Sequence, residues 1–318
     1  MSAGPRGLAL AVTSDSSENE SVKTDLNQWI QAVTTGDKGA RSALTEFFER
    51  EILQWRDSTT REQRFCFPRV ECVPFPYEPN LRAWAETGDP DGQFYMGRVV
   101  EASSLSSLSP KENQWYQKAA EGGHAKSQYL IGSHAVITVG EIHWLRASAK
   151  QGFPPAQRDL GSYYYSGMPG VLQSFEQAAV WWGKAAAGGD PYALWSLGLL
   201  YAAGEGVPED KMRALDLFRE AAWKSKDLKY LLGRLFEKGI ATGLVQRGVQ
   251  GFSPDLLQAH AWYNLTNSEG VVTSWTDGLW VEGGDEEGGL ARVTKKLTPA
   301  QLAEAQRLAR EWLIQHQE

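Results

Sequence analysis

Apolar and polar residues follow the period of an α-helix along most of this 318-residue chain. The stretch YALWSLGLLYAAGEGVPEDKMRALDLFREAA, from Tyr192 to Ala222, shows the unit best. Asp190 and Pro191 supply an N-cap and a first-turn Pro for its first helix. One face of that helix carries apolar residues at every fourth position: Ala193, Leu197 and Tyr201. After a Gly-Glu-Gly-Val-Pro turn, a second apolar face follows: Ala214, Leu217 and Ala221. The pattern predicts a helical hairpin that must stack on a neighbour.

The same unit recurs along the chain. A motif of an aromatic residue or Leu, then small residues, closes at Gly88, Gly123, Gly152, Gly189, Ser225 and Gly270. A second motif, a large apolar residue followed by Gly, keeps the same register: Gly97, Gly132, Gly161, Gly198 and Gly233. Gly inside a helix costs about 1 kcal/mol relative to Ala, so five in one register predict that the paired helix approaches closely at that position.

These motifs carry a resemblance to a known family. The pattern Ala-x-x-x-Leu-Gly-x-x-Tyr, then Gly-x-Gly-Val-Pro-x-Asp, then Arg-Ala-x-x-Leu-Phe-x-x-Ala-Ala resembles the Sel-1-like repeat (SLR) family, relatives of the tetratricopeptide repeats. The likeness extends from about Asn80 to Gln317, and the tail LTPAQLAEAQRLAREWL resembles the closing helix of bacterial members. The resemblance implies an all-α fold, a right-handed α/α superhelix (solenoid) of about five SLR units with helical caps.

The expected organisation has five parts. Residues 1–20 are Ser-rich and expected to be disordered, and 21–79 form an N-terminal helical cap with an irregular connector. The repeat array occupies 80–270, and a capping helix occupies 297–318. Between them, 271–296 is an insertion in which Asp277-Gly278 favours a small β-hairpin that pairs Trp275 with Trp280. A mobile loop is the alternative for this insertion.

Composition and charge narrow the classes of function. The net charge of −7 with scattered Lys and Arg argues against nucleic-acid binding. The first 21 residues lack a signal-peptide pattern and no apolar stretch is long enough to span a membrane, so we expect a cytoplasmic protein, with the periplasm as the alternative if a native leader is missing. Cys66 and Cys72 are interpreted as free thiols of a reducing compartment. Sequence signatures of nucleotide sites, hydrolase elbows and metal sites are absent, so no catalytic residue, metal or cofactor is expected.

A row of residues appears when the repeats are aligned. One position in each first helix holds a large side chain: Phe94, Tyr129, Arg158, Trp195 and Tyr230. Four positions further on stand Arg98, Ser133, Ser162, Leu199 and Arg234. In helical-hairpin solenoids the first helices line the concave side, where aromatic residues and Arg serve as anchors for a partner. Packing between neighbouring helices is the alternative role for this row.

We therefore interpret the chain as a non-catalytic protein-protein interaction module that binds another protein through its concave groove, with Trp275 and Trp280 as a second candidate surface. The family resemblance adds an immunity or adaptor role toward a toxin of a type VI secretion system. A general signalling or envelope scaffold is the alternative, and a hydrolase acting on β-lactams is a further one, because some cysteine-rich relatives have been assigned that activity.

Overall fold

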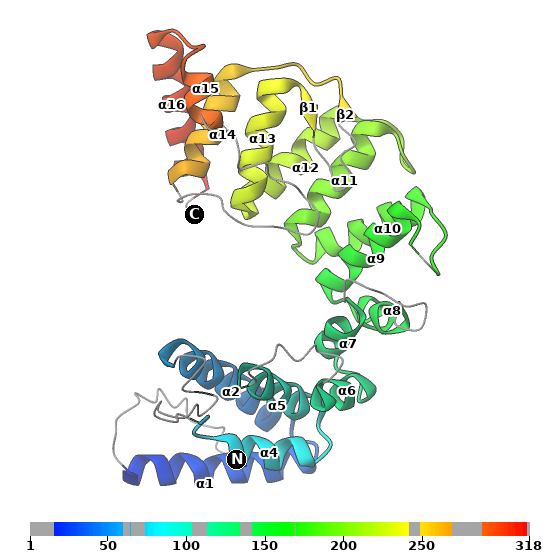
Figure 1. The fold of residues 1–318 in the computed structure, drawn as a ribbon, viewed down its shortest axis with the longest axis vertical. Coiled ribbons are helices and arrows are strands. Elements are labelled where there is room, and N and C mark those ends of the chain that lie inside the picture. Colours follow the sequence, from blue (N-terminus) through cyan, green and yellow to red (C-terminus); the bar gives the residue numbers. More distant parts are fainter. Residues whose placement is uncertain are drawn as a thin grey trace, which may run out of the picture. The chain divides into compact units, whose positions relative to one another are not determined.

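The computed structural model describes residues 16–59, 64, 74–103, 113–133, 142–168, 170–241, 249–268 and 288–316. The chain divides into two compact units, Met1–Ile131 and Gly132–Glu318. Both are built from helices that follow one another as hairpins (Figure 1). The predicted array of 80–270 is thus shared between two units.

The first unit contains α1 (Ser16–Thr34), α2 (Lys38–Ser58), α4 (Glu78–Glu86), α5 (Pro90–Ser103), α6 (Gln114–Glu121) and most of α7 (Ala125–Gly132). The second contains α8 (Ile142–Lys150), α9 (Pro154–Ser166), α10 (Phe175–Ala187), α11 (Pro191–Ala203), α12 (Lys211–Lys224), α13 (Lys226–Lys238), α14 (Leu256–Ser268), α15 (Gly289–Thr294) and α16 (Pro299–Gln315). The expected start of α11 is confirmed, since Asp190 accepts from the Ala193 N–H at 2.8 Å and Pro191 opens the helix.

The close approach expected at the repeated Gly is also confirmed. A Cβ on Gly97, Gly161, Gly198 or Gly233 would lie 2.5–2.8 Å from the ring of an aromatic residue on the following helix. The four pairs are Gly97 with Tyr116, Gly161 with Trp182, Gly198 with Phe218, and Gly233 with Tyr263. At Gly132 the neighbour is the backbone nitrogen of Leu145, at 2.6 Å. Each of these hairpins therefore closes where a ring or backbone occupies the place of a missing side chain.

Two of these rings are tyrosines whose hydroxyl groups hydrogen-bond to a glutamate, a feature that the sequence analysis does not predict. The Tyr116 hydroxyl donates to Glu101 at 2.7 Å, and the Tyr263 hydroxyl donates to Glu237 at 2.9 Å. Both carboxylates stand four residues after the repeated Gly, so they lie one helical turn along the same face. Where the ring is Phe218 and has no hydroxyl, that position is Ala202. In these three hairpins the residue four places after the Gly matches the facing ring, because a buried hydroxyl needs an acceptor. In the fourth, the Trp182 Nε1–H donates instead to the carbonyl of Arg158 at 3.0 Å.

The turns that close the repeats share a left-handed Gly. Gly88, Gly123, Gly152 and Gly189 have φ between 87° and 92°. After Gly123, Gly152 and Gly189, the next residue donates its N–H to the carbonyl five residues back. Gly36, between α1 and α2, has φ 90° and the same bond, from Asp37 N to Ala32 O at 3.1 Å. The N-terminal segment expected to be a separate cap therefore uses the turn of the array.

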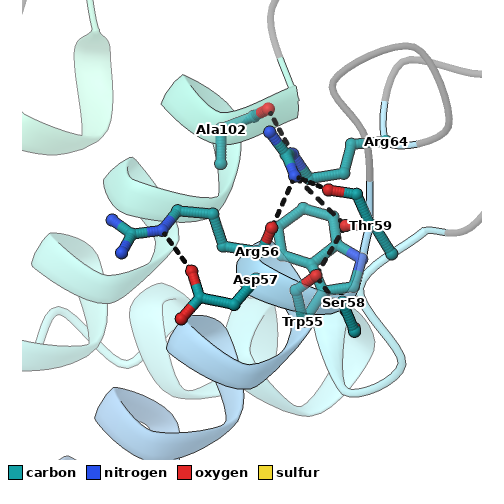
Figure 2. Close-up of polar contacts among 7 residues, drawn as sticks. All are labelled: Trp55, Arg56, Asp57, Ser58, Thr59, Arg64 and Ala102. Carbon is teal, nitrogen blue, oxygen red and sulfur yellow. Dashed lines mark hydrogen bonds and ion pairs between the residues drawn. The ribbon is translucent and has the colours of Figure 1, made fainter.

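Arg64 closes the C-terminal end of α2. Its Nη1 donates to the carbonyls of Arg56 at 2.8 Å and Thr59 at 2.5 Å, and its Nε donates to the carbonyl of Ala102 in α5 at 3.1 Å (Figure 2). The last carbonyls of a helix lack intrahelical partners, and a cation is favoured there. Arg64 thereby ties the ends of α2 and α5 together over the ring of Trp55. Cys66 and Cys72 lie outside the described residues.

The last part of the second unit folds back on α13 and α14. In the described residues the two strands are β1 (Ile240–Ala241) and β2 (Val249–Gln250), an antiparallel pair in the long connection before α14. After residues 269–287, which are not described and include the expected Trp275–Trp280 hairpin, α15 is anchored by Arg292, whose Nε and Nη2 donate to Glu237 at 2.8 and 2.9 Å. Then α16 begins with a capping box between Thr298 and Gln301 and packs on α14.

The Gly–ring contact gives a direct prediction for stability. We expect Gly198→Ala to lower the free energy of unfolding of the second unit by about 1–3 kcal/mol, because the new Cβ would stand 2.6 Å from Phe218 Cε1. Gly183→Ala is the matched control. Gly183 is also inside a helix but has nothing within 4 Å of the added Cβ, so this change should stabilise by about 0.5–1 kcal/mol. Urea unfolding of both variants checks the prediction, and equal effects would contradict it.

The buried Glu237 predicts a dependence of stability on pH. The hydrogen bonds from Arg292 lower the pKa of Glu237 to about 2, whereas Glu in an unfolded chain titrates near pH ~4.3. A lowered folded-state pKa contributes stability that is present above pH ~4.3 and is lost as the pH falls toward 2. We expect Glu237→Gln to destabilise the second unit by about 2 kcal/mol at pH 6, and this difference should shrink toward zero near pH 2. Denaturant titrations at several pH values test this, with the exposed Glu209→Gln as the control. A difference that is independent of pH would contradict it.

Candidate partner-binding site

The structure separates the residues of the predicted first-helix row. Phe94 is 3% exposed and stacks on His124 with ring centroids 4.4 Å apart, and Trp195 is 1% exposed and packs on Phe218 at 4.3 Å. These two side chains therefore have the alternative role, packing, and are not offered to a partner. The row is also divided between the units, since Phe94, Arg98 and Tyr129 belong to the first and the others to the second.

The arginines of the row that have described partners take part in local ion pairs. Arg158 contacts Asp159 at 3.0 Å and Asp190, the N-cap of α11, at 3.4 Å. Arg98 lies 3.8 Å from Glu49 of α2. Their first role is to join neighbouring helices within a unit.

The remaining positions are partly exposed. Tyr129, Tyr230 and Arg234 keep part of their side chains at the surface, although Tyr230 also packs against Tyr263 with centroids 5.3 Å apart. Trp275 and Trp280 lie outside the described residues. A candidate contact surface in this row therefore remains on α13, where Tyr230 and Arg234 lie one helical turn apart.

A groove that the sequence reading did not identify lies at the C-terminal end of the second unit. It has a volume of about 820 Å³ and lies among α12, the start of α14 and the end of α16. We call it the aromatic groove. Its lining residues are Arg219, Glu220, Trp223, Lys224, Asp255, Leu257, Gln258, Trp262, Leu308, Trp312, Gln315 and His316. A volume of this size lies within the range of about 300–1,000 Å³ that is typical of ligand sites.

Three indoles and an imidazole form the apolar part of the groove. Trp262 is 2% exposed and lies between two partly exposed rings, with centroids 5.2 Å from Trp223 and 5.0 Å from Trp312. The Nε1–H of Trp262 is buried without an acceptor among the described residues. His316 covers Trp223 in a parallel stack at 3.8 Å and 12°. The groove thus has a buried aromatic base and two aromatic sides that solvent reaches.

The charged residues of the groove balance one another. Lys224 Nζ lies 2.9 Å from Glu220 one turn back on α12, and Arg219 lies 3.6 Å from Asp216. Asp255 caps α14 by accepting from the backbone N–H groups of Leu257 and Gln258 at 3.0 and 3.1 Å. The rim is therefore polar without an uncompensated charge of either sign.

The sequence held a signal for this groove, but only for its parts. Trp262 opens the motif WYNLTNSEG and Trp312 lies in the predicted closing helix, so the sequence predicts that each Trp lies on a helix. Their meeting depends on how α16 returns to α14 after a long connection, and helical periodicity says nothing about that path.

Burial shifts the titration of a histidine in the first unit. His124, buried against Phe94, has its pKa lowered to about 4 by burial. Among the described residues, three or more His, Cys, Asp or Glu are nowhere grouped so as to hold a metal ion. None of the helices in the described ranges combines the length and hydropathy needed to cross a membrane.

Comparisons with known proteins identify the repeats and the fold to which this chain is similar. The sequence model of the Sel1 repeat matches residues 113–124, 154–190, 191–222 and 229–270, and the last three segments coincide with the hairpins α9–α10, α11–α12 and α13–α14. An uncharacterised protein of Neisseria meningitidis serogroup B is 32% identical over 148 residues, which cover 45% of this chain and 30% of that protein. This chain therefore matches less than a third of the length of that relative.

Two solved structures share the fold. A protective antigen of uropathogenic Escherichia coli that displays an SLR fold is similar with a TM-score of 0.58 and 22% identity, over 92% of this chain and 64% of that one. A Sel1 repeat protein from Oxalobacter formigenes is similar with a TM-score of 0.50 and 25% identity, over 61% of this chain and 78% of that one. The fold class is all-α, of the α/α-solenoid type. The matched segments and the shared fold together show that the chain contains Sel1 repeats and has the SLR fold.

Proposed function

We propose that this chain is a non-catalytic protein-interaction module and that its partner docks in the aromatic groove of the second unit. The family supports the general class, because Sel1-type repeats form a protein-interaction fold. The observation that carries the location is the groove's composition, two partly exposed tryptophans over a buried one inside a charge-balanced rim.

This composition matches what concentrates binding energy at protein interfaces. Hot spots are enriched in Trp, Tyr and Arg, and they lie in pockets from which water is excluded. Trp312 and Trp223 provide such side chains on two different helices, α16 and α12. They are held by Trp262, so little side-chain entropy is lost when a partner covers them.

Tyr230 and Arg234 on α13, which are partly exposed and belong to the predicted first-helix row, form a further candidate surface. An Arg and a Tyr one helical turn apart can anchor a partner in the same way. The two surfaces lie on different helices and can be tested by separate variants.

Two biological roles remain for such a module. One is an immunity or adaptor role toward a secreted type VI toxin, which requires one tight partner with defined stoichiometry. The other is a signalling or envelope scaffold, which requires two partners bound at once. The first is our proposal, and it comes from the family resemblance alone.

Capture of partners tests the proposed site. The immobilised chain is exposed to a lysate of the source organism, and proteins bound by the wild type, by Trp312→Ala and by Tyr230→Ala/Arg234→Ala are compared. We expect Trp312→Ala to weaken the captured partner's affinity by about 30-fold or more, since loss of a hot-spot Trp costs about 2 kcal/mol. Circular dichroism and thermal unfolding verify that the variants are folded.

Each result has a defined meaning. Loss of one stoichiometric toxin-like protein in Trp312→Ala supports the groove and the immunity role, and simultaneous loss of two partners supports a scaffold. Loss only in Tyr230→Ala/Arg234→Ala would move the site to α13. Equal capture by all three proteins would contradict both surfaces.

The competing class, a hydrolase acting on β-lactams, has a direct test. We expect no nitrocefin hydrolysis above the uncatalysed rate at micromolar protein. The Ser127 hydroxyl lies 3.0 Å from His124 Nδ1, but Ser127 is fully buried, so a substrate cannot reach this pair. Turnover that co-purifies with the chain would overturn the non-catalytic assignment.

A further inference from the structure

We infer that the aromatic groove accepts a neutral aromatic side chain from a partner's peptide segment, and that His316 occupies this place in the free chain. The inference deepens the proposed function and rests on it. It names the chemistry of the ligand and adds a self-contact that the ligand must displace.

The stack of His316 on Trp223 indicates that a planar ring fits against the Trp223 indole. His316 is an exposed residue at the end of α16, yet its ring lies parallel to the Trp223 indole at 3.8 Å. Its Nδ1 is 2.9 Å from the Trp312 carbonyl, which fixes the ring over the groove. A flat ring brought by a partner would make the same stacking contact with Trp223 once His316 moves aside.

The apolar lining of the groove and the balanced charges of its rim favour an uncharged planar group. Leu257 and Leu308 line the groove beside the buried Trp262 and add apolar surface to it. The rim carries two cations and two anions, and these are held by contacts with Glu220, Asp216 and the N-terminus of α14. An Arg or a phosphorylated Tyr would bring a charge that this rim does not compensate, whereas Phe, Tyr or Trp brings none.

Competition between His316 and the ligand predicts two variants of opposite effect. Removal of His316 frees Trp223 and should tighten binding, by about two- to tenfold if the stack is typical of aromatic pairs. Removal of the indole in Trp223→Leu should weaken binding by a similar factor. Ile314 is the matched control, because it is 69% exposed on the same turn of α16 and does not line the groove.

The test uses three capped tripeptides as probes: acetyl-Gly-Phe-Gly-amide, acetyl-Gly-Leu-Gly-amide and acetyl-Gly-Arg-Gly-amide. Each is titrated into the full chain while tryptophan fluorescence excited at about 295 nm is recorded, a wavelength at which Phe does not absorb. Wild type, His316→Ala, Trp223→Leu and Ile314→Ala are compared, and thermal unfolding verifies that each is folded.

We expect saturable binding of the Phe peptide ahead of the Leu and Arg peptides, tighter in His316→Ala and unchanged in Ile314→Ala. Equal affinity for Phe and Leu, a preference for Arg, no saturation, or no tightening in His316→Ala would each overturn the inference. Because His316 is exposed, a folding defect of Trp223→Leu leaves the His316→Ala result decisive. Failure here combined with partner loss in Trp312→Ala would leave the proposed function intact, so the two are distinguishable.

Discussion

The contact between a helix Gly and the ring of the following helix sets the geometry of these hairpins. If Gly97, Gly161, Gly198 or Gly233 carried a Cβ, the nearest atom of the facing ring would be only 2.5–2.8 Å from it. Two helices can come this close only if one of them lacks a side chain at the crossing point. The cost of Gly within a helix, about 1 kcal/mol, is offset by burial of an aromatic side chain.

This constraint explains other features of the same units. A ring held over a Gly places its polar atom one helical turn along, so Tyr116 meets Glu101 and Tyr263 meets Glu237. Glu237 is only 4% exposed as a side chain and would be costly without partners, and it also holds Arg292 and therefore α15. One packing contact inside a hairpin is thus extended, by hydrogen bonds, to a helix 55 residues further along the chain.

Much of the fold was accessible from the sequence because the repeat is local. The register of Gly198 and its relatives, the cap at Asp190 and the left-handed closing Gly each depend on neighbours within one or two helices. The first-helix row was less accessible. A helical wheel places Phe94 and Trp195 on a face, but only the packing of His124 and Phe218 against them determines that the rings are covered. The division into two units, and the hydrogen bonds from Tyr116 to Glu101 and from Tyr263 to Glu237, depend on contacts that the repeat pattern does not encode.

The aromatic groove follows from where the repeats stop. Each second helix carries an aromatic or Leu at the start of its closing motif, and on α14 that residue is Trp262. After it, the described chain continues with α15 and the single helix α16 rather than another matched hairpin. α16 places Trp312 against Trp262 and His316 against Trp223, and a groove remains among α12, α14 and α16. The closing-motif ring Trp262 is therefore covered by Trp223 and Trp312 rather than by a further hairpin. Because these two covering rings are themselves partly exposed, the groove keeps an aromatic surface.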